Sequence, residues 1–458
     1  MNNSNTFLDL SGREMLTNLF DDGSFVELGA YVKRNGSVSE NEGVICGYGS
    51  VNSRLVFAFA QDRTSSGGAV DAYHAKKIEM LYEMALKNGS AVIGIFDSDG
   101  ATVLDGFSSV SAYGRIVKCI SDASGKIPQI AILSGVCNGT MAAAFQMFDI
   151  RIAIKDVSML YVGSPSIIGE AFGKTEFIVK NGLVSTVSND LASAIDCARS
   201  FIELMPDNCN GKAVSESSDD VQRDTFLDME DTRNCIEEIS DGYKFVELYR
   251  DYAEDMITAF TTVGGLTVGI VANNVKCNGG RVTPKGAEKA STLISFCDSF
   301  SIPVVTLANS DGVEVSSEAE QARIASAMAK LLTSYASATT PKITVILNNL
   351  YGSSCILMGS KSVGADVVYA LDSASIGALS PSAAVAFFEN AKVDSADTRQ
   401  RLEEDWNKTN LTAAKAAENG DIDDVITSYD LRRRICSALY MLSEKNTPLC
   451  KKHSTAIM

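Results

Sequence analysis

Residues 51–100 read VNSRLVFAFAQDRTSSGGAVDAYHAKKIEMLYEMALKNGSAVIGIFDSDG, and residues 263–312 read VGGLTVGIVANNVKCNGGRVTPKGAEKASTLISFCDSFSIPVVTLANSDG. The two stretches align without a gap when the chain is shifted by 212 positions. The identical residues include Gly67-Gly68 against Gly279-Gly280 and the Ser-Asp-Gly that ends each stretch. Because the matches gather where turns demand particular backbone angles, the chain is predicted to contain two copies of one fold, each of about 200 residues.

Short apolar runs alternate with longer helix-like stretches in both copies. The expected strands are residues 55–60, 91–96 and 130–133 in the first copy, and 268–272, 304–307 and 343–347 in the second. The expected helices are residues 71–87, 108–121, 284–300 and 318–337. This alternation is typical of an α/β layer fold with a largely buried sheet. The acidic segment 207–241 is expected to connect the halves, with a helix beginning near Cys235; an acidic surface loop inside one domain is the alternative.

Composition excludes several functional classes. The 458 residues include 57 Asp and Glu against 40 Lys and Arg, a net charge of −17. Such an acidic chain argues against nucleic acid or an anionic membrane as the main partner. No apolar run approaches the roughly 18 residues of a membrane helix, and the N-terminus lacks the pattern of a signal peptide. The length predicts two domains, and we expect a cytoplasmic protein.

Cysteine and histidine usage narrows the chemistry further. The eleven cysteines include no C-x-x-C pair, so neither a zinc site nor a redox motif is predicted, and we expect no metal in this chain. The only histidines are His74 and His453, and no G-x-S-x-G elbow is present for a serine hydrolase. The chemistry is therefore expected to proceed almost without imidazole.

A glycine-rich turn follows the third expected strand of each half. Residues 132–139 (ILSGVCNG) lie over residues 345–352 (VILNNLYG), one residue out of step with the first alignment. A helix that starts at such a turn leaves backbone N–H groups unpaired, and these favour a negatively charged oxygen. Gly67-Gly68 and Gly100-Ala101 end earlier strands and are expected near the same edge of the sheet. The alternative is that these glycines only allow helices to pack on strands.

Nucleotide-binding loops are not supported. Gly173-Lys174-Thr175 resembles the end of a phosphate-binding loop, but the required earlier glycine is replaced by Ile168. No G-x-G-x-x-G follows an expected strand, so a dinucleotide-binding fold is also not predicted.

Residues 45–101 resemble the N-terminal half of biotin-dependent acyl-CoA carboxyltransferases, the family of propionyl-CoA carboxylase β subunits and of methylmalonyl-CoA and glutaconyl-CoA decarboxylase α subunits. The resemblance continues, in the family's order, over nearly the whole chain. The further matches are Arg13-Glu14, residues 22–28 (DGSFVEL), Tyr113-Gly114, residues 127–130 (IPQI), Glu288-Lys289-Ala290, Tyr351-Gly352, Gly364-Ala365-Asp366, residues 423–426 (DDVI) and Lys451-Lys452-His453.

The resemblance implies an α/β protein of two tandem crotonase-like (ClpP/crotonase) domains. The acyl-CoA side is expected in residues 1–235 and the biotin side in residues 236–458. By resemblance, the catalytic pockets are Gly139-Thr140 for the thioester and Ser353-Ser354 for biotin. The implied substrate-binding residues are Gly67, Gly68, Gly100, Ala101, Gly352 and Ile356. The expected function is transfer of a carboxyl group between carrier-bound biotin and a short acyl-CoA, with enolates held by two backbone oxyanion pockets.

The resemblance also implies the cofactor and the partners. Biotin is expected on a separate carrier protein, because the chain has no Met-Lys attachment site. The expected partners are acyl-CoA, a biotin carboxyl carrier protein, and biotin carboxylase or membrane decarboxylase subunits. The chain is expected to form a homo-oligomer, a hexamer by resemblance, or a mixed oligomer with a second carboxyltransferase subunit.

Several departures leave a second function open. Residues 97–102 (DSDGAT) replace the family's DSGGAR, and residues 136–141 (VCNGTM) replace part of its GPCAGGA. Residues 308–313 (ANSDGV) stand where V-D-x-P-G-F is usual. The alternative is a weakly active or inactive structural or regulatory subunit. A hydratase or isomerase is disfavoured, because no Glu or Asp lies between Gly135 and Phe148 to act as acid or base. The acyl chain and the direction of the reaction stay open.

Overall fold

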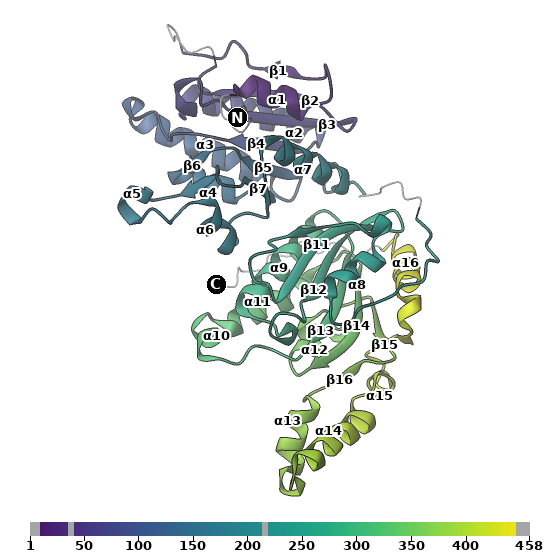
Figure 1. The fold of residues 1–458 in the computed structure, drawn as a ribbon. Helices are drawn as coiled ribbons and strands as arrows, with labels where there is room; N and C mark the ends of the chain where they lie inside the picture. The colour runs from purple at the N-terminus through teal and green to yellow at the C-terminus, as the bar shows by residue number, and fades with distance from the viewer. Residues whose placement is uncertain (1–9, 35–40, 213–218, 446–458) are drawn as a thin grey trace, which may run out of the picture. The chain divides into compact units, whose positions relative to one another are not determined.

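The computed structural model describes residues 10–34, 41–212 and 219–445. It divides into two compact units, Met1–Ala213 and Val214–Met458 (Figure 1). The division predicted after residue 235 falls within helix α8 (Thr232–Ile239), which belongs to the second unit. The extreme N-terminus and the Lys451-Lys452-His453 motif lie outside the described residues.

The first unit is built from α-helices and β-strands in alternation. They are α1 (Gly12–Leu19), β1 (Val26–Leu28), β2 (Val44–Val51), β3 (Arg54–Gln61), α2 (Ala72–Asn88), β4 (Val92–Phe96), α3 (Phe107–Ala123), β5 (Gln129–Leu133), β6 (Val136–Asn138), α4 (Gly139–Gln146), β7 (Ile150–Ile154), β8 (Met159–Tyr161), α5 (Pro165–Ile168), α6 (Thr175–Lys180), β9 (Thr186–Ser188) and α7 (Leu191–Leu204).

The second unit repeats this order and adds a helical excursion after β16. Its elements after α8 are β10 (Phe245–Leu248), β11 (Met256–Val263), β12 (Leu266–Asn273), α9 (Pro284–Ser299), β13 (Val304–Ser310), α10 (Ser317–Gln321), α11 (Ile324–Ser337), β14 (Lys342–Tyr351), α12 (Ser354–Leu357), β15 (Val367–Leu371), β16 (Ser375–Gly377), α13 (Pro381–Ala384), α14 (Ala396–Asn410), α15 (Ala413–Ala417), β17 (Asp424–Ile426) and α16 (Leu431–Met441).

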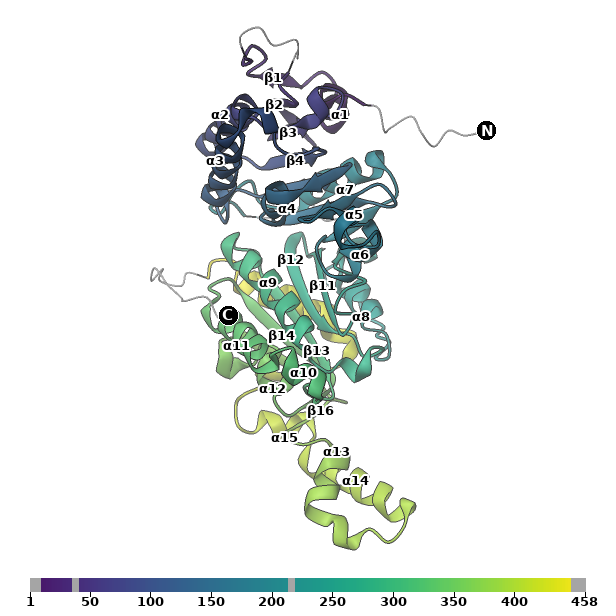
Figure 2. The ribbon, with the colours of Figure 1, turned by 90° about the vertical axis from the view of Figure 1, so that its left-hand side faces the viewer.

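The two main sheets have the same topology. Their strand orders are β1-β2-β3-β4-β5-β7-β9 and β10-β11-β12-β13-β14-β15-β17. The first three strands of each sheet pair antiparallel and the later strands pair parallel. Helices α2 and α3 cover one face of the first sheet and α1 and α7 the other, as α9 and α11 and then α8 and α16 do for the second (Figures 1 and 2). The predicted α/β layers and the internal repeat are therefore confirmed.

Most expected elements lie within a few residues of the observed ones, but two differ. The single helix expected over residues 318–337 is wrong, because Arg323 adopts a left-handed φ of 63° and separates α10 from α11. The helix after the second glycine-rich turn, α12, has only 4 residues, whereas its counterpart α4 has 8.

The repeat extends into ion pairs that the sequence alignment did not include. Arg199 on α7 donates to the carbonyl of Leu19 and to the Asp21 carboxylate, which closes the end of α1 onto α7. Arg432 on α16 makes the same pair of contacts in the second unit. Its guanidinium donates to the Ile239 carbonyl and to the Asp241 carboxylate, each at 2.5 Å. Each closing helix therefore holds the helix that begins its unit.

A buried lysine occupies the equivalent position in each unit. Lys77 Nζ donates to the carbonyls of Asn41 and Val44, at 2.9 and 3.1 Å. Lys289 Nζ donates to the carbonyls of Tyr249 and Tyr252, at 2.8 and 2.9 Å. Burial lowers the pKa of Lys77 and lowers that of Lys289 to about 8. These ammonium groups tie the loop before the second strand of each sheet to the following helix.

Replacing Arg432 should destabilise the second unit far more than replacing a neighbouring arginine. The Arg432 side chain is 0% exposed, so an Arg432→Met variant leaves the Asp241 carboxylate buried without its cation. We expect a loss of about 3–5 kcal/mol in the free energy of unfolding. Arg434 on the same helix pairs with Asp424, both 44% exposed, and Arg434→Met should cost about 1 kcal/mol or less. Urea unfolding followed by circular dichroism measures both; equal losses would contradict the assignment.

His74 should make the first unit sensitive to acid. The ring is completely buried at the start of α2, and burial lowers its pKa from 6.5 to about 4. Between about pH 6.5 and pH 4, His74 is protonated in the unfolded chain but neutral in the folded one. The free energy of unfolding therefore falls as the pH drops through this range. The full effect is about 3 kcal/mol. A His74→Gln variant should lose this part of the pH dependence in unfolding measurements at pH 7.5 and pH 4.5, and parallel curves for the two proteins would refute it.

Candidate active site

Glycine pairs after β3 and β12 hold the loops of the next strands in place. Gly67 and Gly279 have the same φ, 62°, within the short turns Ser66–Gly68 and Asn278–Gly280. A Cβ on Gly67 would lie 2.5 Å from Asp99 Oδ2, and a Cβ on Gly279 would lie 2.5 Å from Asp311 Oδ2. Only glycine permits this approach, so close packing by itself accounts for glycine at these two positions.

The loop after β4 contains the Ala101 N–H, whose neighbours on both sides are hydrogen-bonded. The N–H groups around it donate within the first unit: Asp99 to the Gly67 carbonyl at 2.9 Å, Gly100 to Ser98 Oγ at 3.1 Å, and Thr102 to the Val70 carbonyl at 3.0 Å. The Ala101 N–H has no acceptor among the residues that the structure describes. The partly exposed position of Ala101 lets a ligand reach this donor.

The second unit repeats the arrangement. The N–H groups of Asp311, Gly312 and Glu314 donate to the Gly279 carbonyl at 3.1 Å, to Ser310 Oγ at 3.1 Å and to the Val282 carbonyl at 3.0 Å. The N–H of Val313 is left without an acceptor in the described part of the chain. Val313 was not among the predicted site residues. The internal repeat aligns it with Ala101, which is the signal that could have identified it.

The third turn of each unit begins a helix and supplies further backbone donors. Gly139 and Gly352 have φ values of 56° and 60°, which glycine adopts readily. Gly139 and Thr140 form the start of α4, where N–H groups lack partners within the helix. In the second unit the Gly352 N–H already donates to the Gly377 carbonyl at 2.9 Å, whereas the Ser353 N–H has no acceptor among described residues.

The Ser354 side chain does not project from this turn. It is 0% exposed, and its hydroxyl donates to the Tyr351 carbonyl at 2.7 Å. The hydroxyl therefore points into the turn, while Ser353 and Thr140 are exposed. The donors at the second turn stay accessible despite the serine.

In each unit a side-chain oxygen links the loop after β4 or β13 to the segment before the turn at Gly139 or Gly352. Asp97 Oδ1 accepts the Val136 N–H at 3.0 Å, and the Asp97 N–H donates to Gln61 Oε1 at 3.2 Å. The second unit has the same contacts, in which Asn309 Oδ1 accepts the Asn349 N–H at 3.1 Å and the Asn309 N–H donates to Asn273 Oδ1 at 3.1 Å. These residues lie near or just beyond the carboxyl ends of strands in the parallel part of each sheet, so the turns collect at that edge, where ligands usually bind in such folds.

The predicted residues are thus grouped by unit. Gly67, Gly68, Gly100, Ala101, Gly139 and Thr140 gather at the edge of the first sheet, and Gly352, Ser353, Ser354 and Ile356 at the edge of the second. Asn138 is an addition that the sequence reasoning treated only as a departure. Its Nδ2 donates to the Asp99 carbonyl at 3.3 Å, and its Oδ1 lies 3.0 Å from where a Gly100 Cβ would be. Its carboxamide therefore lies between the two turns of the first unit.

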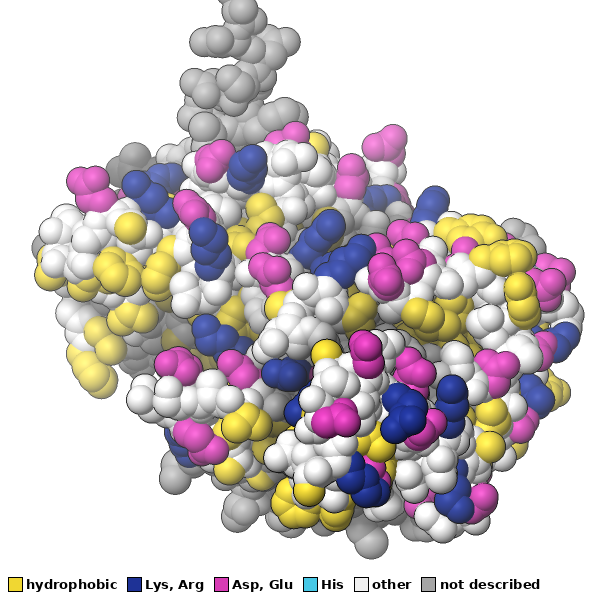
Figure 3. Space-filling model, turned by 60° about the horizontal axis from the view of Figure 1, so that its bottom comes forward, with side chains coloured by type: hydrophobic (Ala, Val, Ile, Leu, Met, Phe, Trp, Pro, Cys, Tyr) yellow, Lys and Arg dark blue, Asp and Glu magenta, His cyan; other side chains and the backbone are white. Residues whose placement is uncertain are grey.

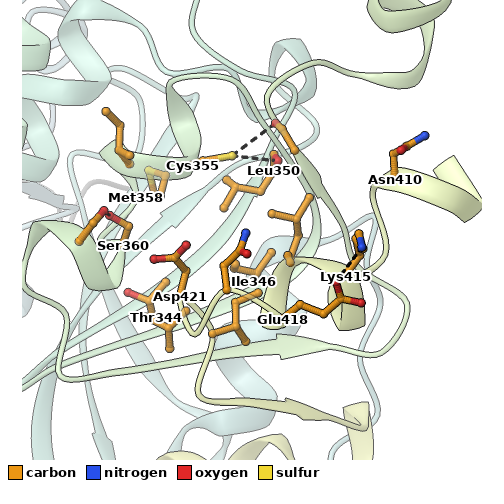
Figure 4. A pocket seen from close by; sticks show the side chains of 18 residues that line it. Thr344, Ile346, Leu350, Cys355, Met358, Ser360, Asn410, Lys415, Glu418 and Asp421 are labelled. Atoms are coloured by element: carbon orange, nitrogen blue, oxygen red, sulfur yellow. Dashed lines mark hydrogen bonds and ion pairs between the residues drawn. The ribbon is translucent and has the colours of Figure 1, made fainter. Parts of the chain in front are cut away.

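A cavity of about 490 Å³ lies beside α12 in the second unit (Figure 4). Ile356 is among the residues that line it. Its wall includes Ile346, Leu350 and Ile376, and its rim carries the ion pair of Lys415 with Glu418 at 2.7 Å. Cys355 Sγ contacts the carbonyls of Leu350 and Gly377, at 3.2 and 3.5 Å, and burial raises its pKa. The lining combines these apolar side chains with polar ones such as Thr344, Ser360 and Asp421, as sites for organic molecules often do.

A buried carboxyl elsewhere in the first unit is not part of the site. Burial raises the pKa of Asp149 to about 7, a value suited to acid–base chemistry. However, Asp149 precedes β7 and accepts the N–H of Gln129, the first residue of β5. It therefore lies at the amino edge of the parallel strands, opposite the turns. The described residues contain no cluster of His, Cys, Asp or Glu that could hold a metal ion, and no helix among them is long and apolar enough to cross a membrane.

The molecular surface carries both signs of charge. In the face drawn in Figure 3, Lys and Arg side chains are interspersed with Asp and Glu, and hydrophobic groups lie between them. No single-sign field of the kind that attracts nucleic acid covers this face.

Comparison with known proteins supplies the family. The family model described as the carboxyl transferase domain matches residues 10–456. The methylmalonyl-CoA decarboxylase α subunit of Veillonella parvula is 33% identical over 97% of this chain and 92% of its own length. The putative propionyl-CoA carboxylase β chain of Bacillus subtilis (strain 168) is 31% identical, again over 97% of this chain and 92% of its own.

A solved structure agrees with the sequence relatives. A transcarboxylase 12S crystal structure, described as showing hexamer assembly and substrate binding with hydrolysed methylmalonyl-coenzyme A bound, matches with a TM-score of 0.92. It is 31% identical and the match covers 98% of this chain and 93% of that one. The predicted pair of crotonase-like domains is confirmed by this likeness, and the chain belongs to the carboxyl transferase domain family of enzymes.

Proposed function

We propose that this protein moves a carboxyl group between biotin on a separate carrier protein and a short acyl-CoA. Methylmalonyl-CoA and propionyl-CoA, named in the relatives, are the first substrates to consider. The observation that carries the proposal is the same in both units. A loop leaves one N–H unpaired, at Ala101 or Val313, and a neighbouring turn adds donors at Thr140 or Ser353. We infer that the two N–H groups of each unit point to one carbonyl oxygen that gains negative charge during reaction.

In this proposal the first unit binds the thioester. The N–H groups of Ala101 and of the Gly139-Thr140 turn donate to the thioester oxygen, which becomes negative when the α-proton leaves. The glycine turn at Gly67-Gly68 fixes the loop that carries Ala101. No carboxylate or imidazole is required at this position, which agrees with the absence of Asp and Glu between Gly135 and Phe148.

The second unit is proposed as the biotin side. Biotin, when its carrier presents it, supplies the carboxyl group and accepts the α-proton of the acyl group. The unpaired N–H groups of Ser353 and Val313 fit a ureido carbonyl, which is a pure hydrogen-bond acceptor. Ile356 and the apolar wall of the cavity beside α12 would limit the size of what binds there. The site then works by position and by backbone electrostatics rather than by a dedicated side-chain base.

The proposed partners follow from the same assignment. The chain requires a biotin carboxyl carrier protein, together with biotin carboxylase or membrane decarboxylase subunits that set the direction of the reaction. The related transcarboxylase 12S structure describes hexamer assembly, so we infer a hexamer, either of this chain alone or with a second carboxyltransferase subunit.

One observation favours the alternative of a weakly active or inactive subunit. The Asn138 carboxamide lies between the Gly100-Ala101 loop and the Gly139-Thr140 turn, where a smaller side chain would leave space. If this carboxamide stays in place when acyl-CoA binds, it competes for the thioester oxygen's position. The protein would then contribute its fold and its interfaces to an assembly in which another subunit turns over substrate.

A proline substitution can remove one proposed donor without disturbing the backbone. Ser353 has φ −64°, the angle that proline imposes, and its N–H makes no hydrogen bond that proline would break. Ser353→Pro should lower the rate of biotin-dependent carboxyl transfer by about 10²–10³-fold, the usual effect of losing one oxyanion donor. Ser353→Ala keeps the N–H and should stay within a few-fold of the parent protein. Equal rates for the two variants, with unchanged thermal stability, would exclude the donor.

The equivalent substitution in the first unit tests the proposed thioester pocket independently of the proposed biotin pocket. Thr140 lies in the first turn of α4, where helices tolerate proline. Thr140→Pro should lower transfer to acyl-CoA by a similar factor, about 10²–10³-fold, while Thr140→Ala should not. Both are measured by carboxyl transfer from the biotin carrier to propionyl-CoA. A proline variant that keeps full activity shows that the N–H is not used.

The isolated chain should itself be catalytic. We expect it to bind propionyl-CoA in calorimetric titration and to decarboxylate malonyl-CoA when free biotin is added. Asn138→Ala should raise the decarboxylation rate if the carboxamide obstructs the first pocket. Absence of turnover in both the parent and Asn138→Ala would favour the structural subunit, and absence of binding to any short acyl-CoA would refute the proposed thioester pocket of the first unit.

A further inference from the structure

In the first unit an arginine, Arg63, lies beside the loop that carries the Ala101 N–H. Arg63 follows β3, and its guanidinium lies between two carboxylates of the loop after β4. Nη1 is 3.1 Å from Asp97 Oδ1, and Nη2 is 2.6 Å from Asp99 Oδ1. The cation neutralises two acidic groups that stand next to the free Ala101 N–H.

The second unit has the same frame without the arginine. A shift of 212 positions places Val275 at Arg63, Asn309 at Asp97 and Asp311 at Asp99. The carboxylate of Asp311 holds the pose of Asp99, since each lies 2.5 Å from the Cβ position of its glycine partner. A cavity of about 380 Å³ opens at this place, lined by Val275, Asn309, Asp311, Asn348, Asn349 and Glu230 among others.

The groups around this cavity are only partly satisfied by one another. Asp311 Oδ1 accepts a single neutral donor, Asn349 Nδ2, at 3.2 Å. Lys276 reaches the cavity wall, but its Nζ is 2.5 Å from Asp231 Oδ2 and pairs there. Glu230 has no ion pair within the described ranges of the chain. The lining therefore keeps a net negative charge. Asn309 Oδ1 accepts the Asn349 N–H and Asn349 Oδ1 accepts the Tyr351 hydroxyl, and each of these oxygens can accept one more hydrogen bond.

We propose that this cavity binds a guanidinium group, carried either by a small molecule or by an arginine of another protein. The argument rests on the internal repeat, because the first unit places a guanidinium in the equivalent position against the equivalent carboxylate. A guanidinium is planar and presents several donors in a fixed array, which suits one carboxylate together with neighbouring amide oxygens. An ammonium ion has the charge but not this geometry. The inference does not depend on the proposed carboxyl transfer.

Calorimetric titration of the full chain with agmatine and with methylguanidinium tests the site. We expect saturable binding to one site per chain, and weaker binding of 1,5-diaminopentane and methylammonium, which carry ammonium groups instead. Asp311→Asn removes the charge and should weaken guanidinium binding about tenfold or more. The matched change in the first unit, Asp99→Asn, should leave the binding unchanged.

Val275→Arg supplies the arginine that the first unit already has. Its side chain should occupy the cavity, abolish agmatine binding and raise the thermal midpoint through an ion pair with Asp311. Titration with a short arginine-containing peptide and with its lysine counterpart distinguishes the two sources, since a partner's arginine requires the peptide to bind at least as tightly as agmatine. Binding that is absent, equal for ammonium and guanidinium, or unaffected by Asp311→Asn overturns the proposal. The Asp311→Asn result decides even if Val275→Arg does not fold.

Discussion

In each unit a buried serine hydroxyl accepts the N–H of the glycine two residues later, and the rest of the site depends on this short loop. The bonds from Gly100 to Ser98 and from Gly312 to Ser310 are both 3.1 Å long. The N–H groups on both sides of Ala101 and of Val313 are also bound, whereas those of Ala101 and Val313 have no acceptor among the residues described. A backbone donor without a partner is unfavourable when buried, so the fold keeps it where a ligand can reach it.

Buried lysine and arginine side chains hold the surrounding segments in place by donating hydrogen bonds to backbone carbonyls. Within the described part of the chain, the Lys77 and Lys289 ammonium groups donate to backbone carbonyls of the loop that precedes a strand. Arg432 combines a carbonyl and a carboxylate at a position where its side chain has no solvent exposure. Buried cations of this kind hold two chain segments at a defined distance, because neither partner can leave without exposing an unpaired charge.

The two units share the same loops but differ in the charged side chains beside them. In the first unit the Asp97 carboxylate pairs with Arg63. In the second unit the equivalent residues are the neutral Asn309 and Val275. Both side chains keep the same backbone N–H contact, since a carboxylate oxygen and an amide oxygen accept equally well in that geometry. The position of the turns is therefore preserved while the electrostatic environment differs. A similar exchange occurs inside the core, where His74 corresponds to Gly286 and the latter leaves room for the Asp255 carboxylate.

The sequence by itself determined the duplication, the strand and helix alternation, the glycine turns and the family resemblance, because these depend on local backbone geometry and on periodic burial. Only the tertiary structure decided which N–H groups are free. Gly352 donates to Gly377, which is 25 positions away, and Ser354 turns its hydroxyl inward, so Ser353 supplies the exposed donor. The cavity beside α12 likewise results from contacts between segments distant in the chain. Hydrogen-bond partners of this kind come from the pairing of strands, which no local pattern encodes.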